Sequence, residues 1–179
     1  MPKLIQEQQH TAFDALKGDF GWKNRLQVPK ITKVVVSVGV GKMTKDKGKV
    51  QLVADRLAKL TGQKAATRSA KKAIASFKTR IGDHIGYQVT LRGRRAQDFL
   101  NRLVHVALPR TKDFKGISLA AIDGMGNYTL GVREHVVFPE VADEDIKDVF
   151  GLAVTVVTTA KNKKEAQAYL THLGFPFKK

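Results

Sequence analysis

Four short segments of the chain alternate apolar and polar residues with a period of two. In the segment 85–92, for example, Tyr87, Val89 and Leu91 alternate with polar residues. The same pattern recurs in the segments 31–41, 127–133 and 152–160. Successive side chains of a strand point to opposite faces, so each segment is predicted to be a strand buried on one side only. Such strands are typical of a mainly antiparallel sheet with one apolar and one polar face.

Helical periodicity separates these predicted strands. Apolar residues recur at helical spacing within 4–18, 50–62, 94–109 and 162–174. Gly62 is predicted to cap the second helix, and Asn162 with Glu165 to begin the last one. Gly18 and Pro109 are predicted to end the first and third helices. These segments predict an α+β fold, with a mainly antiparallel sheet and helices packed on one face, in an RRM-like or ferredoxin-like layout.

The chain is expected to form one domain over residues 1–179, with a basic loop projecting at about 76–86. No internal repeat, low-complexity tract or Ser/Pro linker interrupts the sequence. Gly82 and Gly86 flank a polar connection between two predicted strands, as expected for a projecting hairpin loop. Lys78, Arg80 and His84 on this loop could reach an anionic partner, but an idle surface loop has the same composition, and both interpretations stay open.

Positive charge is concentrated in residues 62–95, which hold nine lysines and arginines against one acid, Asp83. With a formal net charge of +16 over the whole chain, a polyanionic partner is favoured, nucleic acid first. The N-terminus lacks the apolar run of a signal peptide, and no segment reaches membrane-spanning length. A cytoplasmic protein without a membrane partner is therefore expected. The absence of cysteine excludes disulfides, thiolate metal sites and zinc-ribbon nucleic-acid binders.

Negative charge is concentrated in residues 134–148, where six acids face only one lysine, Lys147. Charge runs of this kind usually form solvated loops and helix starts. They also form binding surfaces for basic partners. The residues alone leave both interpretations open.

No residue pattern indicates catalysis. Gly39, Gly41 and Lys42 follow a predicted strand as in a phosphate-binding loop. However, Thr44 stands where a dinucleotide fingerprint needs glycine, and Met43 where a Walker loop needs serine or threonine. The five histidines are dispersed, so no metal, cofactor, small-molecule substrate or enzyme is expected. A nucleotide-using enzyme acting through the 39–42 turn is the runner-up interpretation.

The polar face of the predicted sheet carries hydroxyls, amides and cations, which suits RNA. Tyr87 and Tyr128 fall on the apolar side, so the exposed aromatic pair of RNA-recognition modules is missing. Contacts to RNA backbone, 2′-hydroxyls and shape are therefore expected, and folded RNA is favoured over a single strand. Phe77 lies among cations and either contacts the partner or anchors its loop in the core. A general nucleic-acid chaperone or DNA-architectural protein is a third interpretation.

Several long motifs closely resemble one family, the bacterial large-subunit ribosomal protein five, which binds 5S rRNA. The motifs are LTGQKAATRSAKKAIASFKTRIGDHIGYQVTLRG, FLNRLVHVALPRTKDFKGI, GNYTLGVREHVVFPE and the terminal LGFPF. The resemblance extends from Pro2 to Lys179. It implies a structural, non-catalytic protein of the central protuberance that binds 5S rRNA, helps to attach it to the large subunit and touches 23S rRNA.

The resemblance also implies which residues bind rRNA. Family positions that contact 5S rRNA match Lys33, Gln63, Phe77, Arg80 and Thr90. Position 37 is commonly asparagine in the family and is serine here, although a hydroxyl can still donate and accept a hydrogen bond. With basic neighbours included, the predicted rRNA-binding set is Lys33, Ser37, Gln63, Lys64, Arg68, Phe77, Arg80, Thr90 and Arg92.

Two further partners follow from the resemblance. The family's projecting loop, matching Ser76 to Gly86, approaches the elbow of the P-site tRNA, and the predicted residues are Lys78, Thr79, Arg80, Gly82 and His84. The far side forms a bridge to a small-subunit head protein through regions matching 110–116 and 134–148. The predicted bridge residues are Arg110, Lys112, Glu140, Asp143, Glu144 and Asp145. A basic head protein would suit the acidic segment.

Overall fold

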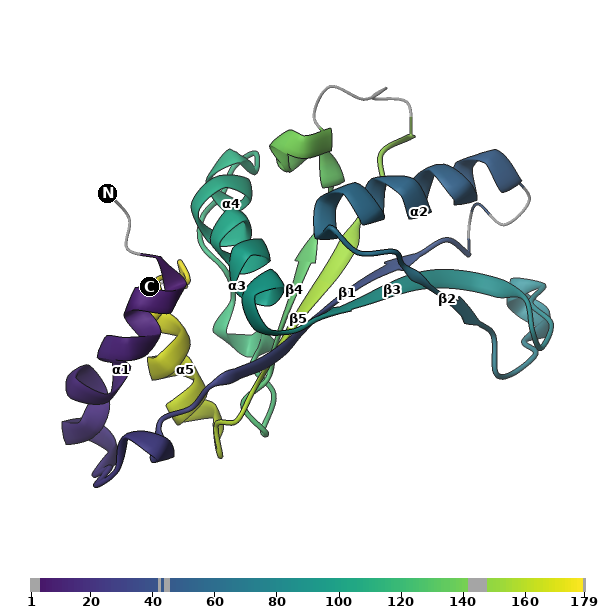
Figure 1. Cartoon of the computed structure of the whole chain (residues 1–179). Helices are drawn as coiled ribbons and strands as arrows, with labels where there is room; N and C mark the ends of the chain where they lie inside the picture. Colours follow the sequence, from purple (N-terminus) through teal and green to yellow (C-terminus); the bar gives the residue numbers. More distant parts are fainter. Residues whose placement is uncertain (1–3, 42, 44–45, 142–147, 179) are drawn as a thin grey trace. The chain divides into compact units, whose positions relative to one another are not determined.

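The computed structural model describes residues 4–41, 43, 46–141 and 148–178 (Figure 1). Its helices and strands, in chain order, are α1 (Ile5–Phe20), β1 (Ile31–Gly39), α2 (Lys47–Thr61), β2 (Ala66–Ser69), β3 (His84–Leu91), α3 (Gly93–Arg102), α4 (Leu108–Arg110), β4 (Tyr128–Val132), β5 (Leu152–Thr158) and α5 (Lys163–His172). Short 3₁₀ turns lie at Arg25–Gln27, Ala75–Phe77, Leu119–Ala121, His135–Val137 and Pro139–Val141, and a π-helical turn at Leu103–Ala107. Within these described ranges, no helix has the length and apolar character needed to cross a membrane.

The five strands form one antiparallel sheet in the order β2-β3-β1-β5-β4. Along β1, Val34, Val36 and Val38 are buried, whereas Lys33 and Ser37 are half-exposed. β3 and β5 alternate in the same way. The predicted α+β class, the mainly antiparallel sheet and the ferredoxin-like layout are therefore confirmed.

β2 is a strand that the sequence did not predict. It pairs antiparallel with β3, with Ala66 opposite Gln88 and Thr67 opposite Tyr87. All four of its residues are exposed, so no apolar–polar alternation marks it. Backbone pairing, and not side-chain burial, keeps this segment extended.

The chain divides into two compact units. The terminal unit comprises Met1–Val34, Leu91–Leu130 and Thr155–Lys179, and the central unit comprises Val35–Thr90 and Gly131–Val154. Four strands, β1, β3, β4 and β5, contribute residues to both units. The expectation of one domain over 1–179 stays a prediction.

Two of the predicted helix ends are confirmed. Gly62 ends α2 in the left-handed conformation, with φ of 65°, and the Asn162 side chain caps α5 by accepting the Glu165 N–H at 2.9 Å. The predicted end at Gly18 is wrong. α1 continues through Gly18 to Phe20 and ends at Gly21, whose φ of 63° is the left-handed value that favours glycine.

The third predicted helix continues through Pro109, so this predicted end is also wrong. α3 passes into the π-helical turn, where the Leu108 N–H donates to the Leu103 carbonyl. α4 then begins with Pro109 in its first turn, where a proline needs no hydrogen-bond donor. The wider turn also shifts the side-chain register: Val106, one of the apolar residues at helical spacing within 94–109, is 36% exposed.

In the terminal unit, α1 packs against α3 and α5. A line of amide side chains joins α1 to α3: Gln97 hydrogen-bonds to Gln6 at 2.6 Å and to Gln9 at 3.1 Å. Asn101 accepts the Ile5 N–H at 2.9 Å, which satisfies a backbone donor at the start of α1. These contacts hold the N-terminal helix on the unit's core.

Two tyrosines make this unit sensitive to alkaline pH. Burial raises the pKa of Tyr128 and of Tyr169 from 10.0 to about 12. A pKa raised on folding contributes stability that is complete below pH 10 and is lost as the pH rises through about 12. We therefore expect the melting temperature to fall steeply between about pH 10 and pH 12. Tyr169→Phe should flatten this fall and leave a smaller pH dependence from Tyr128; an unchanged slope would contradict the assignment.

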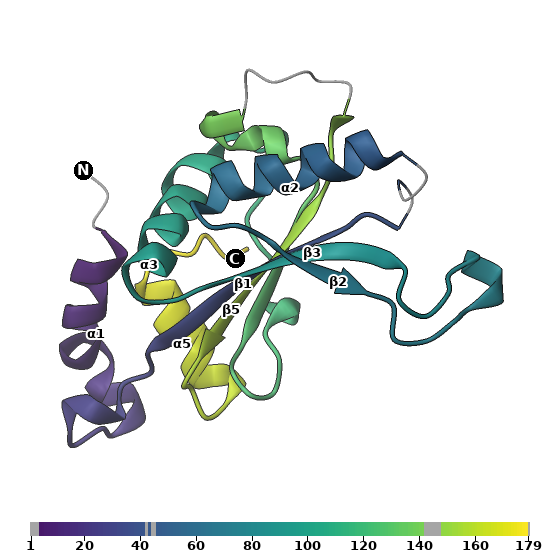
Figure 2. The same ribbon diagram turned by 45° about the vertical axis from the view of Figure 1, so that its right-hand side comes forward.

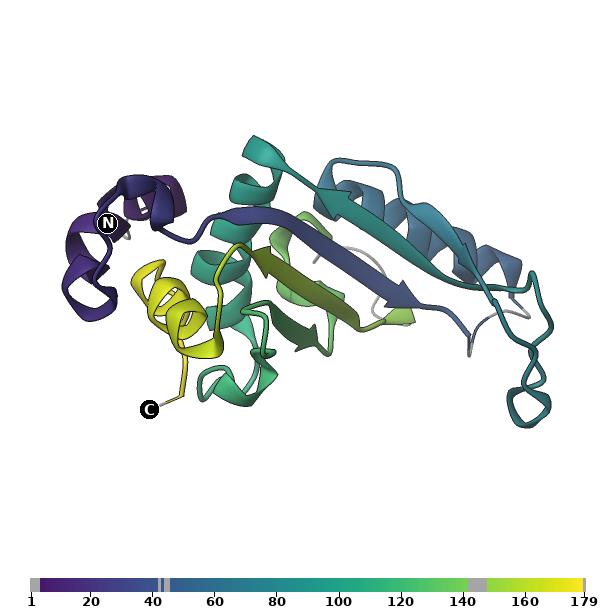
Figure 3. The same cartoon turned by 90° about the horizontal axis from the view of Figure 1, so that it is seen from below.

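In the central unit, α2 covers one face of the sheet residues, and the opposite face is turned toward the viewer in Figure 3. Arg56 of α2 is buried, with its guanidinium 2.9 Å from the Asp148 carbonyl and 3.2 Å from His135 Nε2. The His135 ring stacks on Phe150, with centroids 4.1 Å apart. This buried polar group joins α2 to the segment that precedes β5.

Candidate nucleic-acid interface

The open face of the central unit brings three predicted rRNA-binding residues onto neighbouring elements. Ser37 of β1 and Thr90 of β3 are half-exposed, and their strands are neighbours in the sheet. Gln63 follows α2, and its Nε2 donates a hydrogen bond to the Thr90 carbonyl at 3.4 Å. The contact holds the Gln63 amide beside Thr90, and because both residues are half-exposed, each can bond to RNA backbone or 2′-hydroxyl groups.

The predicted cations lie in both units. Lys64 and Arg68 are exposed in the central unit, before and within β2. Lys33 is half-exposed on β1 and Arg92 is exposed just before α3, and both belong to the terminal unit. All four side chains have access to solvent, as phosphate contacts require.

The loop between β2 and β3 is an ordered hairpin that extends beyond the strands of the central unit (Figure 2). Two backbone hydrogen bonds close its root: Ala70 N–H to Asp83 at 2.8 Å, and Gly82 N–H to Ala70 at 3.0 Å. Closer to the tip, Ile74 and Thr79 exchange backbone hydrogen bonds of 3.1 and 3.3 Å. These bonds present the loop in a defined shape.

The tip of this hairpin, residues 71–81, combines cations with exposed apolar side chains. Phe77 is 75% exposed, so the interpretation of Phe77 as a core anchor is wrong. Ile74 and Ile81 are 46% and 73% exposed. Four exposed cations surround them: Lys71, Lys72, Lys78 and Arg80. A tip of this kind can make both ionic and apolar contacts with a partner.

Asp83 is an organiser of the loop that sequence reasoning missed. Its carboxylate accepts the Arg80 N–H at 2.6 Å, and its own N–H donates to the Arg80 carbonyl at 3.1 Å. Asp and Gly are both frequent turn residues, so the Gly82–Asp83 pair was the signal in the sequence for a turn here. Gly82 lies between Arg80 and Asp83. Its φ of 92° is a backbone conformation that glycine adopts readily and that residues with a side chain rarely adopt.

His84 and Thr79 differ from the other residues predicted to face tRNA. His84 begins β3, is half-buried, and donates from Nε2 to the Gly86 carbonyl at 2.8 Å. Its ring packs edge-on against Tyr87, with centroids 4.5 Å apart. Thr79 is half-exposed. His84 therefore belongs to the root of the loop, whereas Lys78 and Arg80 belong to the tip.

Gly86 allows β3 to approach β1 closely. A Cβ atom at this position would lie 2.7 Å from the Val38 carbonyl oxygen, closer than side-chain carbons are found in proteins. We therefore expect Gly86→Ala to disturb the pairing of the two strands from which the loop projects.

The predicted bridge residues fall into two groups. Arg110 and Lys112 are exposed in the terminal unit, and Glu140 is exposed in the central unit. Asp143, Glu144 and Asp145 lie outside the described residues. Near the end of the same acidic segment, the Asp148 carboxylate lies 3.0 Å from Lys49 Nζ and, through this hydrogen bond and its charge, raises the pKa of Lys49. Part of the acidic segment is thus paired within its own unit.

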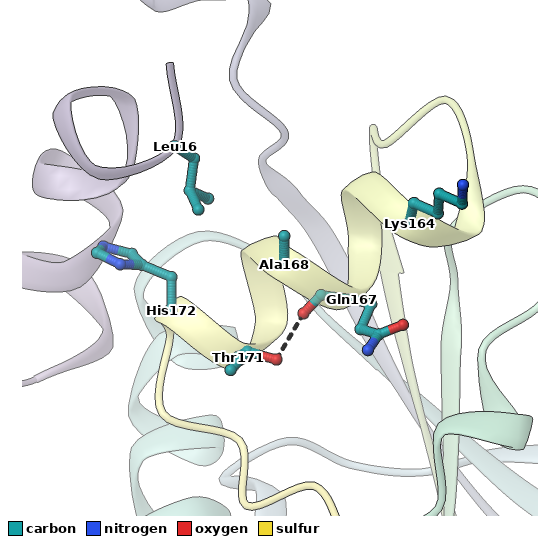
Figure 4. A pocket seen from close by; sticks show the side chains of 6 residues that line it. All are labelled: Leu16, Lys164, Gln167, Ala168, Thr171 and His172. Atoms are coloured by element: carbon teal, nitrogen blue, oxygen red, sulfur yellow. Dashed lines mark hydrogen bonds between the residues drawn. The ribbon is translucent and has the colours of Figure 1, made fainter. Parts of the chain in front are cut away.

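One pocket of the terminal unit is a groove between α1 and α5 (Figure 4). Leu16 and Ala168 form its apolar wall. Two of its polar groups are engaged locally: the Thr171 hydroxyl donates to the Gln167 carbonyl at 2.7 Å, and His172 Nε2 donates to the Gln8 carbonyl at 3.0 Å. The groove therefore offers no pair of groups arranged for acid–base or nucleophilic chemistry.

Family models match most of the chain. The model described as "Ribosomal protein L5" matches residues 24–80, and a second model, which describes the C-terminus of the same ribosomal family, matches residues 84–177. The chain belongs to the ribosomal L5 family. The L5 family is a structural, non-enzymatic component of the ribosome, so the runner-up interpretation as a nucleotide-using enzyme is rejected.

Relatives resemble the chain over nearly its whole length. The large ribosomal subunit protein uL5 of Flavobacterium johnsoniae is 48% identical over 178 residues, covering 99% of this chain and 97% of the relative. The uL5 proteins of Trichlorobacter lovleyi and Christiangramia forsetii are 47% and 48% identical, with 99% and 100% of this chain and 99% and 98% of each relative covered. The resemblance to large-subunit ribosomal protein five is therefore confirmed.

Proposed function

We propose that the chain attaches 5S rRNA to the large ribosomal subunit at the central protuberance, through the open face of its central unit. Membership of the L5 family gives it a structural ribosomal role and rRNA binding. Its homologues are named as large ribosomal subunit proteins, which places the chain in the ribosome in the cytoplasm. The observation that supports 5S rRNA as the ligand is the half-exposed group of Ser37, Gln63 and Thr90: Gln63 and Thr90 match positions at which the family is expected to contact 5S rRNA, and Ser37 replaces the family's usual asparagine.

The remaining partners belong to the same proposal. The projecting hairpin, with Lys78 and Arg80 at its tip, approaches the P-site tRNA, because an exposed and basic tip suits an RNA surface. 23S rRNA is a further partner of the chain's exposed cations. The small-subunit head protein is contacted through Arg110, Lys112 and the acidic segment.

The test is a gel shift of labelled 5S rRNA with the full chain. Thr90→Ala and Gln63→Ala should each weaken binding about 2- to 12-fold, the effect of losing one hydrogen bond, without lowering the melting temperature. Thr129→Ala is the matched control: Thr129 is an exposed strand threonine outside the proposed site, bonded to Thr155. Equal affinity for duplex DNA of the same length would instead indicate a general nucleic-acid chaperone.

A further inference from the structure

A second, smaller pocket of the terminal unit combines aromatic rings, a buried carboxylate and a lysine. Its volume is about 260 Å³, and its lining includes Phe20, Trp22, Gln27, Lys161, Asn162 and Glu165. These residues come from the connection after α1 and from the start of α5. No residue of the proposed 5S, tRNA or bridge surfaces belongs to it.

The aromatic wall of this pocket is held in place. Trp22 stacks on Phe20 with ring centroids 5.2 Å apart and planes 19° apart, and Trp22 is half-exposed. Phe20 therefore supports one face of the indole, and a planar ring that enters the pocket can stack on the other. Nucleobases stack on aromatic side chains in this way in single-stranded nucleic-acid complexes.

The carboxylate of the pocket adds a preference among the bases. Glu165 is only 5% exposed, and its Oε2 accepts the Lys161 N–H at 2.7 Å. A carboxylate has about four lone-pair sites, so it can accept further hydrogen bonds. Guanine carries two adjacent donors on one edge, N1–H and the N2 amino group, which match a carboxylate in bidentate geometry. Each of the other three bases carries only one donor group on that edge.

The size and charge of the pocket fit one base with its phosphate outside. The volume lies below the roughly 300 to 1,000 Å³ of sites for drug-sized ligands, so a single base fits better than a larger group. Lys161, which lines the pocket, is exposed and can neutralise a phosphate.

We propose that this pocket binds an unstacked guanine base, with the base on Trp22, its N1–H and N2 amino group donating to Glu165, and its phosphate near Lys161. That the guanine belongs to ribosomal RNA rests on the proposed function. That the pocket recognises guanine does not, and the two statements are tested by separate experiments.

Trp22 is the chain's one tryptophan, so its fluorescence reports the pocket directly. The full chain is titrated with the four nucleoside monophosphates, and with RNA single strands of equal length that differ only in one guanine, inosine or adenine. We expect guanine to quench most and inosine, which lacks the N2 amino group, to bind more weakly. Saturation by the free monophosphate at the same concentration as the RNA would identify a free nucleotide as the ligand, and tighter, salt-dependent RNA binding would identify RNA.

Variants of the pocket are compared by anisotropy of the labelled guanine strand. Trp22→Ala should weaken binding about 5- to 150-fold, the range for one stacked base, and Trp22→Phe much less. Glu165→Gln keeps an acceptor for the Lys161 N–H but should remove the preference for guanine over adenine. If Trp22→Ala fails to fold, Trp22→Phe and Glu165→Gln still test the proposal. Equal quenching by all four bases, or a guanine preference that survives Glu165→Gln, would overturn the proposal.

Phe77→Ala separates this pocket from the proposed 5S site. It should weaken 5S rRNA binding and leave the guanine preference unchanged. Weakened guanine binding in Trp22→Ala, or loss of the guanine preference in Glu165→Gln, with 5S binding intact supports the pocket alone. Intact guanine preference in a chain that does not bind 5S rRNA would reject only the proposed function.

Discussion

Raising the salt concentration from about 50 to about 200 mM should weaken binding to 5S rRNA about a thousandfold. The expectation follows if about six phosphates are neutralised, because each contact releases condensed counterions and lowers the affinity as salt rises. The cations available for these contacts are Lys33, Lys64, Arg68, Arg80 and Arg92 of the predicted rRNA-binding set, with Lys71 and Lys72 of the hairpin also exposed. Filter binding at a series of salt concentrations gives the slope directly.

Single charge removals test which cations take part. Arg80→Gln removes one phosphate contact. The magnitude of the slope of log affinity against log salt should therefore fall by roughly 0.7 to 0.9. Lys17→Gln is the control, because Lys17 lies on α1 and pairs with Asp14 at 3.5 Å. A flat salt response of the unchanged chain would contradict binding through the phosphate backbone.

Replacing Leu103 with alanine should lower the free energy of unfolding by about 2 to 5 kcal/mol. Leu103 is fully buried at 0% exposure, and its backbone carbonyl accepts the Leu108 N–H within the π-helical turn. Removing its side chain leaves a cavity in the terminal unit that neighbouring side chains can fill only in part. Urea denaturation monitored by circular dichroism measures the loss.

The neighbouring Val106 provides the matched control. It lies in the same π-helical turn but is 36% exposed, so Val106→Ala should cost well under half as much. Both variants should bind 5S rRNA normally at temperatures where they are folded. Equal losses at the two positions would show that the turn, and not burial, controls the effect.

The strands and most helices could be predicted because their burial is periodic. β1 alternates through Val34, Val36 and Val38, and that alternation is visible in the sequence. β2 could not be predicted, because its stability comes from backbone pairing with β3 and its side chains are all exposed. The helix end predicted at Pro109 was wrong for a different reason. A π-helical turn places Pro109 in the first turn of α4, where its missing N–H breaks no helical hydrogen bond.

Prediction of the candidate site was uneven for similar reasons. The polar face of β1 and β3 follows from alternation, so the positions of Ser37 and Thr90 were predictable. The family resemblance supplied Gln63 and Phe77, but exposure of Phe77 required the structure. The pocket at Trp22 gave no sequence signal, because Gln27 and Glu165 are far apart in the chain and meet only in the fold.

The closed root of the hairpin makes its tip a convenient place for a reporter group. Since the chain contains no cysteine, Ser76→Cys would create one thiol for a fluorescent label, on a residue that is exposed and lies beside Phe77. The backbone hydrogen bonds at Ala70, Gly82 and Asp83 lie well away from this position, so the label should leave the loop's frame intact. A dye at residue 76 would then sense, in real time, each molecule that arrives at the tip.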